Sequence, residues 1–195
     1  MSKNIQIQQE NLLNAYKNAS SEQRELLEHL FGSEVFKPTD VRERIKTFHD
    51  AYCALGNDHP FVVSYEKYVN AASGEEADVI AFLQLRIIAA ALNEGWEPQF
   101  TEEECRWYPL FTLWTEEELA QKSEAWKKEH SLWLCGGRSY RGADCGLASA
   151  SSYNAWSYSA AYFSARLAVK SEELAVYFGK QFIEIWAGYV LIANK

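Results

Sequence analysis

The sequence predicts an α+β fold in which a helical N-terminal half is followed by a small antiparallel β-meander packed against a long C-terminal helix. Residues 5–93 carry apolar side chains at helical spacing, with breaks that contain Gly or Ser. The composition changes at Gly95, because all seven tryptophans lie from Trp96 onward. We therefore divide the chain into a helical region, 1–94, and an aromatic-rich α+β region, 95–195. These regions form one continuous domain or two tightly packed subdomains.

Four helical segments are expected in the first region. Residues 5–31 read as helix with a break near residues 19–21, where Ser21 is the expected N-cap. A second helix is capped by Thr39 or Asp40 and runs to Leu55, since its apolar residues step by three or four. A third, short helix begins at His59–Pro60 and reaches about residue 70. Residues 76–93, EADVIAFLQLRIIAAALN, are apolar nearly all round, which is typical of a buried central helix.

The second region mixes extended and helical patterns. Residues 107–114 read as extended, with Pro109 at an edge or a bend. Thr101 and Thr115 each precede three glutamates, the pattern of a capping box; the first starts one short turn and the second a helix to about residue 130. Residues 132–135, 144–151 and 155–169 predict two or three strands of the meander. Ser171 caps the last helix, whose buried face is formed by large side chains, namely Leu174, Phe178, Phe182, Ile185, Trp186 and Tyr189.

Charge and chain ends restrict the partners. The net charge of −8 disfavours nonspecific binding to nucleic acid or to an anionic membrane. The N-terminal residues MSKNIQIQQEN lack the pattern of a signal peptide, and the longest apolar stretch, 79–92, is too short to span a bilayer. We expect a cytoplasmic protein with free, mostly packed cysteines and no membrane partner.

No spacing in the chain matches a metal site. His49 and Cys53 lie four residues apart on one helix, and His130, Cys135 and Cys145 form only a loose array. We expect no metal and no cofactor. Cys145 lies in a turn and, with His130 as its base, is the weak candidate for nucleophilic catalysis. There is no G-x-S-x-G elbow and no P-loop.

Residues 136–166 are the candidate ligand-binding segment because aromatic rings and arginines alternate there with Ser and Ala. Rings stack on flat ligands, and guanidinium groups donate forked hydrogen bonds. The competing interpretation is that one face of this segment packs into the core under the last helix. The candidate ligand-binding residues are Arg138, Tyr140, Arg141, Tyr153, Trp156, Tyr158 and Arg166.

Three parts of the sequence carry a resemblance to a known family. They are residues 45–51 (IKTFHDA), residues 85–109 around ALNEGWEPQF and WYP, and residues 165–183 around ARLAVKS and GKQFI. Over about residues 40–190 the chain resembles a family of uncharacterised proteins found in gut bacteria and in their phages and mobile elements. The resemblance implies an intracellular bacterial or phage setting and an accessory role, and it brings no catalytic residue.

Three hypotheses for function follow. The first is a non-catalytic binding or interaction protein that uses segment 136–166 and takes a protein, a small ligand or a glycan in preference to nucleic acid. The second is a small hydrolase-type enzyme with its site near the 136–145 loop. The third is a phage-associated structural or host-modulating protein whose acidic surface contacts a basic host protein. The oligomeric state is left open by the sequence.

Overall fold

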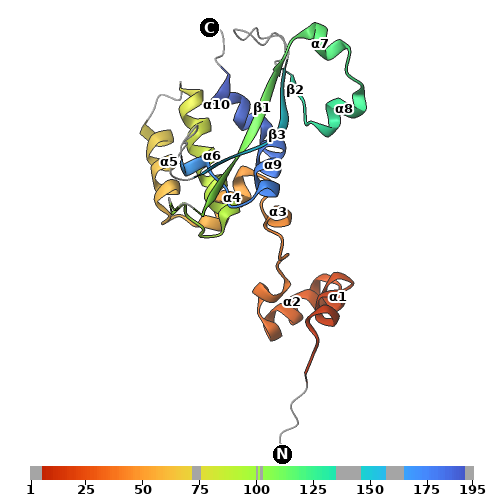
Figure 1. Ribbon diagram of the computed structural model, residues 1–195. Helices are drawn as coiled ribbons and strands as arrows, with labels where there is room; N and C mark the ends of the chain where they lie inside the picture. The colour runs from red at the N-terminus through yellow and green to blue at the C-terminus, as the bar shows by residue number, and fades with distance from the viewer. Residues whose placement is uncertain are drawn as a thin grey trace, which may run out of the picture. The chain divides into compact units, whose positions relative to one another are not determined.

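A computed structural model describes residues 6–71, 76–99, 101, 103–134, 146–156 and 165–191 (Figure 1). The chain divides into two compact units, Met1–Arg44 and Ile45–Lys195. The change of composition at Gly95 therefore falls inside the second unit. Each unit is described by itself below.

The first unit consists of short helices: α1 (Gln9–Lys17), α2 (Ser21–Phe31), the 3-10 helix η1 (Ser33–Phe36) and α3 (Val41–Arg44). The expected break near residues 19–21 is confirmed, but the N-cap is Ser20 and not Ser21, because Ser20 forms a capping box with Gln23 at the start of α2. The Tyr16 ring stacks on Phe36 at a centroid distance of 4.2 Å, and the Tyr16 hydroxyl donates a hydrogen bond to Glu28. These contacts join α1, α2 and η1.

The prediction of a single helix from residue 39 or 40 to Leu55 is wrong, because the chain forms two helices there. After α3, a new helix, α4 (Phe48–Leu55), begins at Thr47. The Thr47 side chain accepts from the Asp50 N–H, and the Asp50 carboxylate accepts from the Thr47 N–H. This capping box has its N-cap residue in extended backbone, so a helix cannot pass through Thr47. The apolar spacing continues across the break and conceals it.

The second unit is built around one buried helix, as the sequence predicts. This helix, α6 (Ala77–Asn93), contacts α4, α5 (Pro60–Ala71) and the C-terminal helices. Leu85, Ile87, Ile88 and Leu92 on α6 are fully buried. At about 2 kcal/mol for each large apolar side chain removed from water, this helix is a main source of the unit's stability.

In the described residues, three strands form one antiparallel sheet: β1 (Cys105–Trp114), β2 (Trp133–Leu134) and β3 (Gly146–Trp156). Their order is β1-β3-β2, so β3 lies in the middle and Pro109 lies on an edge strand, as expected. The described strands form no β-meander, which corrects the prediction. The extended stretch 107–114, which was not predicted to be part of the meander, lies in β1 and pairs with β3 on the side opposite to β2. The broader class is confirmed as a mixed fold dominated by helices.

Between β1 and β2 the chain makes an excursion through two short helices, α7 (Glu116–Ala120) and α8 (Glu124–Glu129) (Figure 1). The single helix predicted from Thr115 to about residue 130 is therefore interrupted. Ser123 begins α8, since its side chain accepts from the Trp126 N–H at 3.1 Å. The capping box of Thr115 and Glu118 at the start of α7 is confirmed.

The expected long C-terminal helix is two helices, α9 (Glu172–Gln181) and α10 (Ile183–Val190). They separate at Phe182, whose backbone leaves the helical region at φ −113° and ψ 29°. The predicted apolar face nevertheless survives the break, because Phe178, Phe182 and Trp186 are all buried. Apolar spacing reports which side chains are buried, and it does not report whether the backbone hydrogen bonds are continuous.

Candidate functional site

Most of the predicted ligand-binding residues lie outside the described residues. Arg138, Tyr140, Arg141 and Tyr158 belong to this group, and so does the weak catalytic candidate Cys145. Tyr153 and Trp156 lie on β3, where their backbones pair with Tyr108 and Cys105 of β1. Arg166 lies in the 3-10 helix η2 (Ala165–Leu167) and is exposed.

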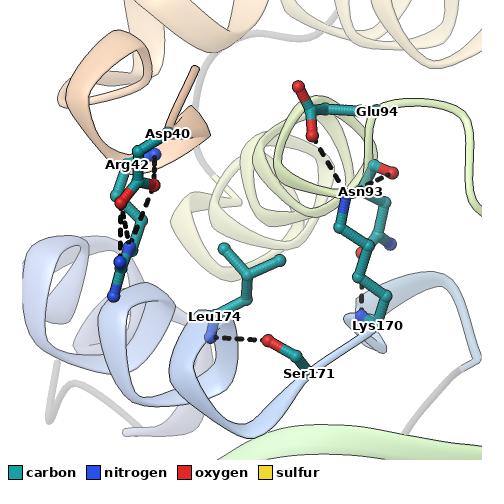
Figure 2. A network of polar contacts seen from close by, with 7 residues as sticks. All are labelled: Asp40, Arg42, Asn93, Glu94, Lys170, Ser171 and Leu174. Carbon is teal, nitrogen blue, oxygen red and sulfur yellow. Dashed lines mark hydrogen bonds and ion pairs between the residues drawn. The ribbon is translucent and has the colours of Figure 1, made fainter. Parts of the chain in front are cut away.

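A buried polar side chain holds the segment that follows Arg166 (Figure 2). Asn93, at the end of α6, donates to the Ala168 carbonyl at 2.8 Å and accepts from the Lys170 N–H at 3.1 Å. The Lys170 ammonium forms an ion pair with Glu94 at 3.0 Å. Because Asn93 is only 5% exposed, these hydrogen bonds are protected from water. These contacts hold the backbone of residues 168–170, which directly follow Arg166 and Leu167, at the end of α6.

The element that carries Arg166, η2, packs against α6, which carries a second arginine, Arg86. The guanidinium carbon of Arg86, on α6, lies 4.2 Å from the centroid of the Phe61 ring and 5.7 Å from that of Phe82. Burial and then the positive charge of Arg166 lower the pKa of Arg86, which stays protonated at neutral pH. Among the described residues no carboxylate forms an ion pair with Arg86. We call Phe61, Arg86 and Arg166 the arginine surface.

A second group of rings lies at the excursion. The rings of Trp114 and Trp126 meet edge to face, with centroids 5.1 Å apart and planes at 79°. The Lys122 ammonium lies 4.6 Å from the Trp114 centroid and 5.0 Å from the Trp126 centroid. His130 stacks on Trp126 at 4.2 Å. All four side chains are half-buried. We call these residues the tryptophan cluster.

His130 is held by its neighbours on α8. Its Nδ1 lies 2.9 Å from the Trp126 carbonyl oxygen, and its ring face is covered by Trp126. Within the described part of the chain it contacts neither a thiol nor a carboxylate, and its suggested partner Cys145 lies outside that part. Its described role is therefore to support the tryptophan cluster.

The other predicted polar groups fall on helix surfaces. On α4 the His49 Nε2 lies 3.5 Å from the Cys53 Sγ, and both side chains are exposed. The described residues contain no group of three side chains that could hold a metal ion. Glu104 accepts from the Gln99 N–H at 2.9 Å, and no helix begins at Thr101.

In the described ranges, no helix has the length and apolar character needed to cross a bilayer.

Neither the arginine surface nor the tryptophan cluster was predicted in full from the sequence. Arg86 was not among the predicted site residues, although a charged residue in an otherwise buried helix is itself a signal of a site. The spacing of Trp126 and His130, four residues apart on one helix, predicts their contact. The contact of Trp114 with Trp126 has no such local signal, because it depends on the path of the excursion.

Comparisons of the chain with protein-family models, with curated proteins and with solved structures found no match. The arginine surface and the tryptophan cluster are therefore the features that bear on function.

Proposed function

We propose that the protein is a non-catalytic binding protein, acting in a bacterial or phage setting, whose ligand contacts segment 136–166. The observation that carries this proposal is the exposed Arg166 on η2, an element that packs against α6, the helix of Arg86. It is the one predicted ligand-binding residue whose side chain lies in the described part of the chain, and its charge acts on Arg86, whose guanidinium lies over the Phe61 ring.

The charges at this surface favour an acidic group on the ligand. Two guanidinium groups lie close enough for the charge of Arg166 to act on Arg86, in a protein whose net charge is −8. A carboxylate, sulfate or phosphate would reduce this repulsion and could accept forked hydrogen bonds from Arg166. The overall negative charge opposes a long polyanion, so a protein, a small ligand or a glycan fits better than nucleic acid.

The backbone around Arg166 supports binding without a large rearrangement. Leu167, Ala168 and Val169 are buried, and Val169 exchanges two backbone hydrogen bonds with Trp107 of β1 at 3.0 and 3.1 Å. An arginine whose backbone is already fixed loses less conformational entropy when it binds. The surrounding groups offer ring faces and hydrogen-bond donors, which suit recognition of a ligand.

The test is a binding screen with the whole chain against acidic peptides, sulfated and carboxylated glycans and single-stranded oligonucleotides. For a ligand that binds, Arg166→Ala should raise Kd at least about tenfold, because a charge-assisted hydrogen bond is lost. Lys67→Ala is the charge-matched control, since Lys67 is exposed on α5, and it should leave Kd unchanged. Binding that is equally strong in both variants would contradict the proposal, as would the absence of binding to every class.

A further inference from the structure

The tryptophan cluster has the geometry of an aromatic cage. Trp114 and Trp126 stand nearly perpendicular, and one ammonium group lies within 5.0 Å of both ring centroids. A cation is attracted to the face of an aromatic ring at distances up to about 6 Å, and tryptophan is the strongest of the three aromatic residues. The chain itself therefore shows what this pair of rings can bind.

Lys122 is held by rings where a neighbouring lysine is held by an acid. On α8 the Lys127 ammonium forms an ion pair with Glu124 at 2.6 Å. For Lys122, the contacts of its ammonium in the described part of the chain are the two ring faces. The rings thus replace a carboxylate as the counterpart of this cation. Lys122 occupies the cage in the way that an external ammonium group would.

The cage walls are supported independently of Lys122. The Trp114 Nε1 is buried, so one edge of that ring is packed into the protein while its face meets the ammonium. The His130 ring stacks on Trp126 at an interplanar angle of 17°, so Trp126 has a packing partner besides Lys122. Both rings should therefore keep their places when the lysine side chain leaves.

We propose that Trp114 and Trp126 form a recognition site for a quaternary ammonium group, and that Lys122 occupies this site when no ligand is bound. A primary ammonium is strongly hydrated, so it gains little from leaving water. A methylated quaternary ammonium is less costly to desolvate, and aromatic cages in proteins bind such groups. The ligand class is a choline-like molecule or a trimethyllysine side chain. This proposal does not depend on the arginine surface.

The first measurement is a titration of the whole chain, labelled with 5-fluorotryptophan, with tetramethylammonium chloride, followed by ¹⁹F NMR. Sodium chloride at the same ionic strength is the reference. Resonances assigned to Trp114 and Trp126 should shift, whereas that of the buried Trp186 should not. Shifts spread over all the tryptophans, or no shift of the two cage residues in any variant, would overturn the proposal.

Two lysine variants make the test specific. Lys122→Ala removes the internal competitor and should increase the affinity for tetramethylammonium about tenfold. Lys127→Ala removes a cation nearby that does not lie in the cage, and it should have no effect. Equal affinities of these two variants would refute the role of Lys122. Lys122→Gln provides a second removal of the charge should the alanine variant not fold.

Further arms identify the ring contribution and the source of the ligand. In the Lys122→Ala background, Trp126→Phe should weaken binding because phenylalanine offers a weaker cation–π surface, and circular dichroism verifies that the variant is folded. Choline and a trimethyllysine peptide are then compared with tetramethylammonium. Tighter binding of the peptide identifies a methylated protein partner, and tighter binding of choline identifies a small molecule. If Trp126→Phe in the Lys122→Ala background binds tetramethylammonium as tightly as Lys122→Ala alone, the cage is contradicted.

Discussion

Two tryptophan-containing regions of the same unit use the same residue in different ways. Trp186 on α10 is 1% exposed and lies 5.0 Å from the Phe178 ring and 5.2 Å from the Phe111 ring. Trp126 on α8 is half-buried, and its neighbours are another tryptophan, a histidine and a lysine. The first region is a packed core, and the second is a surface whose ring faces meet polar groups.

Aromatic side chains in this protein therefore have two separate roles, one in the core and one at the surface. In the core, rings contact rings and aliphatic side chains, so their main effect is on the free energy of unfolding. At the excursion, rings contact a cation that a ligand can replace, so their effect should be on binding. The neighbours of each ring, and not its residue type, separate these two roles.

The largest expected effect comes from removing a core ring. Trp186→Ala should lower the free energy of unfolding by about 3–5 kcal/mol, because a large buried side chain leaves a cavity. Trp126→Ala should cost less than about 1.5 kcal/mol, since its ring is already partly in water. Urea unfolding followed by circular dichroism measures both. Equal losses would break the comparison between the two regions.

A second core prediction concerns the buried Asn93. Asn93→Leu leaves the Ala168 carbonyl and the Lys170 N–H without their buried partner, so it should cost about 2–4 kcal/mol in urea unfolding. The same substitution at the exposed Asn70, which donates to Glu66 at 3.4 Å, is the matched control and should cost less than about 0.5 kcal/mol. A small loss at Asn93 would show that the segment after Arg166 is held by other contacts.

Two capping boxes with the same chemistry allow a finer comparison. Thr47→Ala, at the start of α4, should lower the free energy of unfolding by about 1 kcal/mol. Thr115→Ala, at the start of α7, should mainly increase local opening of the excursion. Amide hydrogen exchange distinguishes the results, because protection should fall in α7 while that of α6 stays unchanged. Loss of protection throughout the second unit would show that the excursion is part of its cooperative core.

The smallest expected effect is a dependence of stability on pH through Asp50. A hydrogen bond from the Thr47 side chain, with the N–H groups of Lys46 and Thr47, lowers the pKa of Asp50 below its ordinary 3.8, although burial opposes this. A carboxyl whose pKa is lower in the folded state stabilises the fold above about pH 4, and this contribution disappears as the pH falls through the lowered pKa. The stability difference between wild type and Asp50→Asn should therefore shrink below pH 4. A difference that is constant from pH 2 to 7 would contradict this.

Helix caps and buried helix faces could be predicted from the sequence where the interacting groups lie within one turn of each other. The start of α7 at Thr115 and the buried face of α6 were predicted for this reason. The start of α4 at Thr47 could have been predicted in the same way from the residues Thr47-Phe-His-Asp50. This helix start was not predicted because the apolar spacing continues through Thr47 and conceals the break.

Neighbours along the chain decide the buried helix α6, the break between α1 and α2 and the extended character of β1, so these three features could be predicted from the sequence. Packing of the chain, and no local pattern, brings β1 against β3, η2 with Arg166 against α6 with Arg86, and Trp114 against Trp126 beside Lys122. The residues of each of these pairs are separated by many positions, and no periodicity links them. Their meeting follows from how the sheet and the excursion fold, which is a property of the packed chain as a whole.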